Sequence, residues 1–370
     1  MIEELLGRNG SGSTPVRFGV VGVGYWGPNV VRNIHELEGA ELVWLCDLRP
    51  EALRKLARRY PSVRTTTRFE ELLQDDEVEA IVVATPVSTH CALATAALES
   101  GKHVMVEKPL AASSDEAESM IELAKETELV LMPGHTFLYS PPVTLIRNLI
   151  TSGDLGEIYF ISTSRVNLGL HQADVSVAWD LAPHDFSILR YWLDELPSHV
   201  SALSRECIVR GIPDVAFINL EFLSTTIAHV ELSWLAPSKL RRTTIVGSEK
   251  MIVYDDTSIE PVRIFDSGVV FQDPKTFGEY KLSYRTGDIV SPRVDPSEPL
   301  SVELLDFCRA IRTGSSPRSH AQLGLDVVRM IEATERSIKL QARVATPALS
   351  PVDAALVTGD DSPARAMSAR

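Results

Sequence analysis

The sequence contains little of what a disulfide-bonded or zinc-binding protein needs. Its four cysteines, Cys46, Cys91, Cys207 and Cys308, are scattered over 370 residues, and none has the CxxC spacing of a metal or redox motif. No cluster of His, Cys, Asp and Glu has metal-ligand spacing either. We therefore expect reduced thiols inside the fold and no metal cofactor.

Long apolar runs and an excess of positive charge are also lacking. No apolar segment approaches the roughly 20 residues that span a bilayer, and residues 1–10 lack the apolar core of a signal peptide. The formal net charge of −14 disfavours nucleic acid and anionic membranes as partners, because phosphates repel an acidic surface. A small anionic ligand needs only a local positive patch and stays compatible. We expect a cytoplasmic protein with neither nucleic-acid nor membrane partners.

The length of the chain and a change in its sequence pattern predict two domains. A chain of 370 residues is too long for one ordinary hydrophobic core. We expect a flexible segment at 1–14, a first domain at 15–136, a second domain at 137–344 and a disordered tail at 345–370. The tail is rich in Ala, Ser, Pro and Asp and has no steady apolar period.

Short β-rich runs alternate with helical stretches in the first domain. Strand–helix alternation of this kind predicts an α/β fold with a parallel, doubly wound sheet of the Rossmann type. The strands are expected at 16–23, 41–48, 80–85, 103–110 and 129–135.

The second domain has a different sequence pattern, with long runs in which apolar and polar residues alternate. Such alternation predicts antiparallel strands with one buried face, in an α+β domain with an open, mainly antiparallel sheet. The open face needs cover, and a second subunit would supply it, so we expect a homodimer or homotetramer. Strands are expected at 157–167, 214–223, 225–235 and 240–247, and helices at 142–152, 300–313 and 320–341.

A glycine motif follows the first predicted strand and precedes a helix. It reads Gly22-Val23-Gly24-Tyr25-Trp26-Gly27, which is GxGxxG in its proper context. The first glycine permits a tight turn, the second lets a pyrophosphate approach the backbone, and the third lets the helix pack on the strand. The helix N-terminus attracts the phosphates. We expect these glycines, with Tyr25 and Trp26 between them, to bind a dinucleotide.

An acidic residue ends the next predicted strand. Asp47 lies 20 residues beyond Gly27 (47 − 27), the spacing expected of a carboxylate on the adenosine ribose hydroxyls. A carboxylate there repels a 2′-phosphate and favours NAD. Arg49 keeps NADP as an alternative, since its guanidinium could bind that phosphate. A purely local role is also open, in which Asp47 starts the turn before Pro50.

The fourth predicted strand ends in Glu107-Lys108-Pro109. A lysine at the carboxyl end of a parallel strand lies in the crevice where such sheets bind ligands. Pro109 ends the strand ladder, through either a trans or a cis bond. Most lysines at strand ends are simply solvated, so a functional Lys108 needs partners elsewhere in the chain.

Residues 178–192, AWDLAPHDFSILRYW, combine an apolar helical stretch with three ionisable groups at its front edge. Asp180 and His184 are four residues apart and share a helix face. Capping by Asp180 is disfavoured because Pro183 lacks the amide that a cap would bind. His184, if in the first helical turn, feels the positive helix end, which favours a neutral ring able to accept a proton. For Asp185, a first-turn carboxylate beside the helix dipole is a sufficient explanation.

Four segments together resemble the Gfo/Idh/MocA oxidoreductase family: GVVGVGYWGPN, ATPVSTHCALATAALESGKHVMVEKPLA, GHTFLYSPPV and WDLAPHD. The resemblance covers residues 16–340. It implies a Rossmann domain, an oligomerising open sheet, NAD or NADP as cofactor, and sugars, inositols or nucleotide sugars as substrates. GHTFLYSP replaces an arginine-bearing segment found in many members, and with WDLAPHD it is closest to members of nucleotide-sugar or polysaccharide pathways.

The resemblance also implies roles for single residues. Lys108 corresponds to the lysine of the EKP motif, and Asp180 and His184 to the pair of a DxxxH motif. Thr85, Pro86 and Glu107 would line the side of the site that holds the nicotinamide ribose, and we expect His90 to contribute to cofactor binding. As substrate contacts we expect His135, Arg165, Asn167 and His171, each of which also has a plain structural explanation.

These residues predict hydride transfer between a nicotinamide and a secondary alcohol or ketone of a sugar or nucleotide sugar. His184 would move the hydroxyl proton, Lys108 would stabilise the developing alkoxide, and Asp180 would orient His184. Two alternatives stay open. One is an NAD-dependent glycoside hydrolase of the same family; the other is a non-catalytic NAD(P)-binding sensor or scaffold, which would not need Lys108, Asp180 and His184 together.

Overall fold

The computed structural model describes residues 14–169, 175–272 and 281–346. The flexible segment predicted at 1–14 lies almost wholly outside these residues, as does most of the disordered tail predicted at 345–370. Within the described chain, Ala345 belongs to a short strand and Thr346 is buried, so ordered packing extends just past residue 344. No helix in this part of the chain is long and apolar enough to cross a membrane.

The first sheet has six strands in the order β3-β2-β1-β4-β5-β6, and all of its pairs are parallel. This confirms the predicted doubly wound sheet. The polar run RTT forms a sixth strand, β3, which has no apolar pattern to reveal it. The strands are β1 Val16–Val21, β2 Ala40–Cys46, β3 Arg64–Thr66, β4 Ala80–Val83, β5 His103–Glu107 and β6 Leu131–Gly134.

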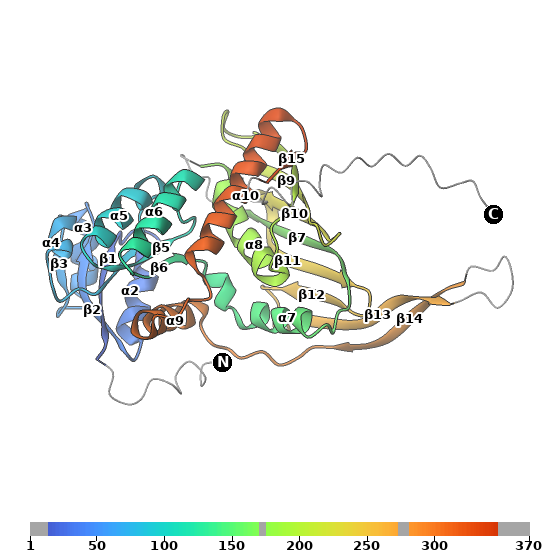
Figure 1. Ribbon diagram of the computed structural model, residues 1–370, viewed down its shortest axis with the longest axis horizontal. Coiled ribbons are helices and arrows are strands. Elements are labelled where there is room, and N and C mark those ends of the chain that lie inside the picture. Colours follow the sequence, from blue (N-terminus) through green and yellow to red (C-terminus); the bar gives the residue numbers. More distant parts are fainter. Residues whose placement is uncertain (1–13, 170–174, 273–280, 347–370) are drawn as a thin grey trace.

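Helices cover both faces of this sheet, as strands buried on both sides require (Figure 1). The chain leaves β1 in one direction to form β2 and later returns to form β4 on its other side, so the strand order reverses at β1. Ligands of such sheets bind beyond the carboxyl ends of the strands at this reversal. The helices are α2 Gly27–Glu36, α3 Pro50–Ala57, α4 Phe69–Leu73, η1 Val87–Thr89, α5 His90–Glu99 and α6 Ser114–Glu126.

The second sheet has nine strands in the order β14-β13-β12-β11-β7-β10-β9-β8-β15. Only β7 and β10 pair in parallel, so the predicted open, mainly antiparallel sheet is confirmed. The hairpin of β13 and β14 extends from the sheet as a long arm (Figure 1) and was not predicted. The strands are β7 Ile158–Leu168, β8 His199–Arg205, β9 Val215–Glu221, β10 Ile227–Ser233, β11 Leu235–Gly247, β12 Met251–Asp255, β13 Val262–Gln272, β14 Lys281–Val290 and β15 Val344–Ala345.

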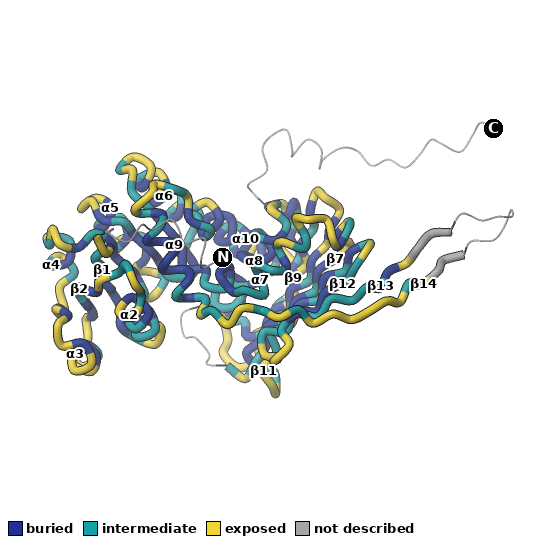
Figure 2. The backbone as a smooth tube through the Cα atoms, turned by 90° about the horizontal axis from the view of Figure 1, so that it is seen from below, coloured by how far each residue is buried: buried dark blue, intermediate teal, exposed yellow. Residues whose placement is uncertain are grey.

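The remaining helices connect the two sheets. α9 packs on α2, and the ring of Phe307 lies 6.0 Å from that of Phe18 in β1. α10 runs from α6 and β6 of the first sheet to α8 and β8 of the second. Figure 2 shows the buried chain of α8, α9 and α10 between the sheets. The elements are η2 Thr136–Tyr139, α7 Pro141–Thr151, α8 Val177–Leu193, α9 Pro299–Thr313 and α10 Ala321–Leu340.

Helix α8 begins earlier than the sequence suggested. Ser176 caps it by accepting a hydrogen bond from the amide of Trp179, so Asp180 lies at the end of the first turn and His184 well inside the helix. The idea that the helix N-terminus keeps His184 neutral was therefore wrong. Pro183 is tolerated inside the helix, where its ring lies buried.

The explanation of Asp185 by the helix dipole was also wrong. Asp185 is 4% exposed and accepts hydrogen bonds from Nε of Arg165 at 2.6 Å and from Oγ1 of Thr163 at 2.9 Å. Arg165 and Thr163 lie on β7, so this buried ion pair holds α8 on the second sheet. The sequence hid the pair because its members are 20 residues apart.

Removing one charge of this pair should destabilise the fold strongly. Asp185→Asn would leave the Arg165 guanidinium buried without a counter-charge, and we expect a loss of about 3 to 5 kcal/mol in the free energy of unfolding. Glu221→Gln is the matched control, because Glu221 and Arg343 form an exposed pair and its loss should cost about 1 kcal/mol or less. Urea denaturation of both variants checks this, and equal losses would contradict it.

Candidate active site

The glycine-rich turn between β1 and α2 has the geometry of a nucleotide cradle. Gly22 has a φ of +90°, and a Cβ there would lie 2.5 Å from the carbonyl oxygen of Ala84. A Cβ on Gly27 would lie 2.2 Å from the carbonyl oxygen of Gly22. At Gly24 a Cβ would approach only the end of the Arg49 side chain, at 3.3 Å. The outer glycines therefore hold the turn together, and the middle one leaves the backbone open to a ligand.

Asp47 follows β2 directly and braces the same turn. It is 7% exposed, and its Oδ2 accepts a hydrogen bond from the amide of Val23 at 2.8 Å. Burial opposes its ionised form, but hydrogen bonds from Arg49 and Val23 outweigh burial and hold the pKa of the carboxyl below its ordinary value. The Arg49 side chain lies across this carboxylate, with Nε 3.0 Å from Oδ1. Both residues named for cofactor selection are thus at the turn, and they pair with each other.

Four further residues predicted to bind the cofactor lie in the glycine turn or in the loop after β4. Tyr25 is 88% exposed, whereas the side chain of Trp26 hydrogen-bonds Glu107 and so links the turn to β5. Pro86 precedes the short helix η1 and Thr85 precedes Pro86. Both follow the carboxyl end of β4, on the ligand-binding edge of the sheet.

His90 has a supporting position. It is 1% exposed, and its two ring nitrogens each lie 2.9 Å from a backbone carbonyl oxygen, one of Pro109 and one of Thr85. The ring therefore ties the loop after β4 to the loop after β5. We assign His90 this bracing role, through which it would act on the cofactor site.

Lys108 reaches across from the first sheet to α8. The peptide bond between Lys108 and Pro109 is cis. The ammonium Nζ donates to the carbonyl oxygen of Asp180 at 2.8 Å and lies 3.4 Å from its Oδ1. The indole of the buried Trp234 donates to Oδ2 of Asp180 at 3.1 Å. The structure thus brings Lys108 and Asp180 together, although 72 residues separate them.

His184 lies on the same face of α8, one turn beyond Asp180. Burial lowers the pKa of its imidazole well below the ordinary value, and the charges of Lys108, Arg165 and Arg241 lower it further. The ring packs edge-on against Phe137, with centroids 4.9 Å apart. No side-chain hydrogen bond joins Asp180 to His184, so the packing with Phe137 orients the ring. The neutral histidine was predicted; burial and cations, rather than the helix end, are its cause.

Two carboxyl groups with raised pKa values lie near each other, the half-buried Glu107 and the fully buried Glu303. Burial raises the pKa of Glu107 to about 7, against the opposing effects of the Lys108 charge and the Trp26 hydrogen bond. Burial raises the pKa of Glu303 well above its ordinary value, and the nearby Glu107 raises it further. Each carboxyl keeps one buried oxygen, Oε1, without a hydrogen-bond partner. An orphaned acceptor of this kind on Glu107 fits a hydroxyl donor such as a cofactor ribose.

His135 directly follows β6 and is almost completely enclosed. It is 1% exposed, and neither ring nitrogen has a hydrogen-bond partner. Burial, followed by the charge of Lys108, lowers the pKa of the ring to about 3. The next residue, Thr136, donates to Oε2 of Glu303 at 2.6 Å. A neutral imidazole with two unused nitrogens can bind a hydroxyl, so a substrate contact remains our prediction for His135.

The other three expected substrate contacts, Arg165, Asn167 and His171, differ in their positions. Arg165 is mainly structural, because it pairs with Asp185. Its Nη1 is nevertheless buried without a partner, and its guanidinium stacks on Phe137 at 4.8 Å. Asn167 is half-buried with an unpartnered Oδ1. His171 lies outside the described residues. Within the described chain no group of three or more His, Cys, Asp and Glu residues could hold a metal ion.

Sequence reasoning missed several residues that shape this site. Phe137, Trp234, Arg241 and Glu303 come from η2, from the end of β10, from β11 and from α9. Glu303 did carry a signal, because it stands in the apolar helical run VELLDF, where an exposed carboxylate is not expected. Its partner could not be read from the sequence, since 167 residues separate Glu303 from Thr136.

A nucleotide cradle, a lysine and a neutral histidine meet at one edge of a doubly wound sheet, and together they define a nucleotide-dependent oxidoreductase. The chain belongs to the Gfo/Idh/MocA family. Residues 16–135 match the model of that oxidoreductase family's NAD-binding Rossmann fold, and residues 143–253 match the model of a GFO/IDH/MocA C-terminal domain. NAD is thus the cofactor of the first domain, and the residues of the turn fit it.

Two curated relatives illustrate the similarity. An oxidoreductase of Streptococcus pneumoniae is 27% identical over 232 residues, which span 58% of this chain and 62% of that protein's length. The myo-inositol 2-dehydrogenase of Thermotoga maritima is 26% identical over 262 residues, 68% of this chain and 78% of the relative.

Two crystal structures extend the similarity to the whole fold. One, described as an oxidoreductase from Magnetospirillum magnetotacticum, shows a TM-score of 0.74 at 30% identity and covers 86% of this chain and 99% of its own. The other, the UDP-N-acetylglucosamine 3-dehydrogenase GnnA of Acidithiobacillus ferrooxidans, has a TM-score of 0.75 at 22% identity over 89% and 99% of the two chains.

The buried neutral His135 should make stability depend on pH. Its pKa is about 3 in the folded protein and about 6.5 when unfolded, so the unfolded chain binds more protons between these values and stability falls as pH falls through this window. His135→Leu removes this contribution. Between pH 7 and pH 5 it should lose about 2 kcal/mol less than the wild type, by urea denaturation at both pH values.

His35→Leu is the control for this comparison, because His35 is exposed at the end of α2. Measured in the same way, it compares the loss of an exposed histidine with the loss of a buried one. A wild type and a His135→Leu variant with the same pH dependence would show that His135 is not held neutral.

Proposed function

We propose that this protein transfers a hydride between NAD and a secondary alcohol or ketone of a sugar or nucleotide sugar. The observation that carries the proposal is the position of the Lys108 ammonium. It is held on Asp180 beside a neutral, half-buried His184, at the carboxyl edge of the NAD-binding sheet. When bound, NAD accepts or supplies the hydride.

His184 is the proton acceptor in the direction of alcohol oxidation. Its ring is neutral at pH 7 because burial and three cations lower its pKa, so it is free to take the hydroxyl proton as the carbon is oxidised. The same position returns the proton when a ketone is reduced. Phe137 holds the ring by edge-on packing, so little motion is needed.

Lys108 is the electrostatic partner of the reacting oxygen. An ammonium has three donor hydrogens, and its carbonyl bond to Asp180 uses one of them. Another can stabilise negative charge that develops on the substrate oxygen. Asp180 therefore positions Lys108 directly, which replaces the orienting role toward His184 that we predicted from the sequence. Trp234 holds the other oxygen of Asp180 and fixes this arrangement.

The substrate class rests on the relatives and on the unpartnered polar atoms near the site. The names of two similar proteins specify myo-inositol and UDP-N-acetylglucosamine, both of which carry secondary alcohols on a ring. Unpartnered polar atoms of His135, Asn167 and Arg165 would serve ring hydroxyls. The cations that act on His184 favour a substrate that carries negative charge, which supports a nucleotide sugar over a neutral polyol.

The two alternatives make different demands on the site. A sensor has no need for a lysine held beside a neutral histidine, and this pair disfavours it. An NAD-dependent glycoside hydrolase would use the same pair in a transient oxidation and would show no net change of cofactor. Nicotinamide fluorescence across a panel of nucleotide sugars and free polyols distinguishes them, because only the dehydrogenase accumulates reduced cofactor.

The open face of the second sheet supports a further part of the proposal. Apolar side chains on this face are partly exposed, among them Leu203, Phe217 and Ile227, at 70%, 42% and 56%. A second copy of the chain would cover them. We therefore keep the homodimer or homotetramer as the proposed assembly.

Replacing His184 should separate catalysis from cofactor binding. His184→Asn keeps a polar side chain of similar length but removes the proton acceptor, so kcat should fall by about 100-fold or more. The dissociation constant for NAD should change by less than about threefold, because the nucleotide cradle is untouched. Steady-state kinetics and NAD titration measure both, with His35→Asn as a control that should change neither. Parallel losses of NAD affinity and rate would argue against the assigned role.

Replacing Asp47 should test cofactor selection. Asp47→Ala removes the carboxylate that would bind the ribose hydroxyls and frees Arg49 from its ion pair. We expect NAD to bind about tenfold more weakly, while NADP is affected less or improves, since the freed guanidinium can meet a 2′-phosphate. Fluorescence titration with both reduced cofactors checks the ratio. An equal loss for both would mean that Asp47 only braces the turn.

A further inference from the structure

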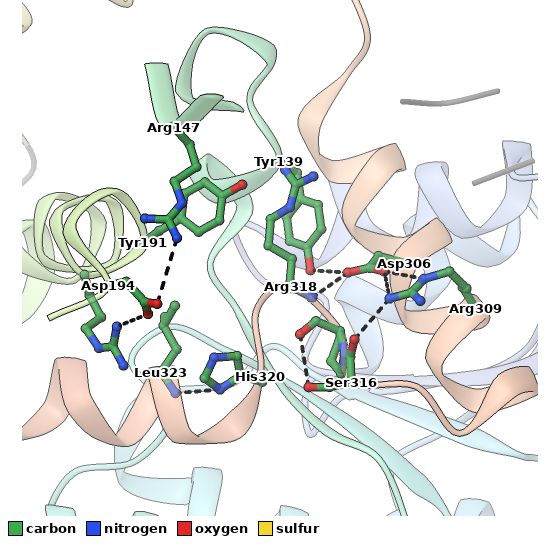
Figure 3. Close-up of a pocket in the computed structure, with 12 residues that line it drawn as sticks. Tyr139, Arg147, Tyr191, Asp194, Asp306, Arg309, Ser316, Arg318, His320 and Leu323 are labelled. Carbon is green, nitrogen blue, oxygen red and sulfur yellow. Dashed lines mark hydrogen bonds and ion pairs between the residues drawn. The ribbon is translucent and has the colours of Figure 1, made fainter. Parts of the chain in front are cut away.

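A second hollow lies farther along α8, separate from the catalytic residues. Its volume is about 440 Å³, and it is lined from η2, α7, α8, α9 and the start of α10 (Figure 3). Four arginines line it, Arg147, Arg190, Arg309 and Arg318, and we call it the arginine pocket. Its Tyr191 stands seven residues beyond His184 on α8, which is about 10 Å along the helix. Nothing in the proposed reaction uses this pocket.

The charges of the pocket do not cancel. Two aspartates line it beside the four arginines, Asp194 and Asp306, a balance of +2 from +4 and −2. Asp326, just outside the lining, pairs with Arg190 and reduces this to +1. Asp306 is fully engaged, because it accepts hydrogen bonds from Arg309, from Tyr139 and from the amide of Arg318. A positive hollow is notable in a chain of net charge −14.

Asp194 is the loosely held member of the pocket. It caps the end of α8 in the left-handed conformation, with a φ of 53°, and its side chain is 74% exposed. Nη1 of Arg190 lies 2.9 Å from its Oδ1, while Nη2 of Arg147 lies 3.9 Å from its Oδ2. An exposed ion pair of this kind contributes little stability. A better anion can therefore replace this carboxylate between the two arginines.

The guanidinium groups are held in place for such an anion. Arg147 stacks on the ring of Tyr191 at 5.5 Å, and Arg318 stacks on Tyr139 at 5.1 Å. In Figure 3 these two stacked pairs lie side by side at the pocket. Stacking fixes the planes of the guanidiniums, and the Nη2 group of Arg147 faces Asp194 at 3.9 Å. The side chains of Arg147 and Arg318 are therefore already oriented before an anion binds.

The first turn of α10 adds to the positive potential. His320 caps this twenty-residue helix by accepting a hydrogen bond from the amide of Leu323, and both residues line the pocket. Burial, and then the charge of Arg190, lowers the pKa of His320, so its ring is neutral. The positive end of the helix dipole therefore acts on the same hollow as the arginines.

We propose that the arginine pocket binds a small phosphate-bearing anion, whose oxygens take the place of the Asp194 carboxylate between Arg147 and Arg190. The planar fork of arginine matches two phosphate oxygens at once. A volume of about 440 Å³ is in the range of small-ligand sites and holds a phosphate with a group attached to it. The anion is either a separate metabolite or the phosphate part of a large substrate.

The short helix η2 connects this pocket to the catalytic residues. The hydroxyl of Tyr139 donates to Asp306, and the carbonyl of Leu138 accepts from Arg318. Phe137 in the same helix packs against His184. An anion that shifts Arg318 therefore acts on a helix that forms one wall of each site.

Isothermal titration calorimetry with inorganic pyrophosphate tests the proposal. The titration is done on the full-length protein with saturating NAD, so that the cofactor's own pyrophosphate position is filled. We expect one site in the wild type and about tenfold weaker binding in Arg147→Gln, which loses a charge-assisted contact. Asp194→Asn should bind severalfold more tightly, because the competing carboxylate is gone and asparagine accepts the left-handed conformation.

Arg343→Gln is the control, because Arg343 lies beyond the far end of α10, about 30 Å from His320. Its affinity for pyrophosphate should equal that of the wild type. Circular dichroism melting shows whether Arg147→Gln is folded, and the gain in Asp194→Asn tests the pocket independently of it. Wild-type protein that takes up no pyrophosphate, or equal affinity in all variants, would overturn the proposal.

Inhibition kinetics with pyrophosphate separate the two sources of the anion. With the sugar substrate varied, competitive inhibition that weakens in Arg147→Gln assigns the pocket to the phosphate of the substrate. Noncompetitive inhibition, or activation, with the same dependence on Arg147 assigns it to a separate metabolite acting through η2. The calorimetric result does not depend on activity, so it stands even if the proposed substrate class is wrong.

Discussion

Lys108, at the end of β5, reaches the carbonyl and carboxylate of Asp180 on α8, and this contact joins the two sheets at the site. Asp180 is held in turn by Trp234 on the second sheet, while α8 is locked to β7 by the buried pair of Asp185 and Arg165. The position of the ammonium therefore depends on both domains at once. Because α9 and α10 also pack between the sheets, the parts of this site are set by one continuous core.

Burial is the second organising effect, since it decides the protonation of nearly every titratable group around Lys108. It keeps His135 and His184 neutral and raises the pKa values of Glu107 and Glu303. At neutral pH the two histidines can therefore accept hydrogen bonds or a proton. The raised pKa values allow the carboxyl groups to be protonated. The arginine pocket is the contrasting case, because its exposed Asp194 leaves the arginines accessible to solutes.

Much of the fold could be predicted because the periodicity of apolar residues is a local property. The buried runs of β1, β4 and β5 and the alternating runs of β7, β9 and β10 all formed strands where they were expected. The misses have local causes as well. The strand β3 is a short polar run. Helix α8 starts at Val177 because the preceding Ser176 caps it, which outweighs the weaker signal at Asp180.

The sequence by itself determined the class of the molecule, through the glycine turn and through Asp47 at the expected spacing. It also led us to propose Lys108 and His184 as the reacting pair. The glycine turn is a local motif, Asp47 has a fixed spacing from it, and the pairing of Lys108 with His184 came from the family resemblance. Only the tertiary structure decided that Asp180 contacts Lys108, that Asp185 is a buried anchor and that Glu303 lies near Glu107. It also brought together in one pocket four arginines from α7, α8, α9 and the loop before α10. Each of these depends on contacts between residues far apart in the chain, where packing and burial set the partner and the charge.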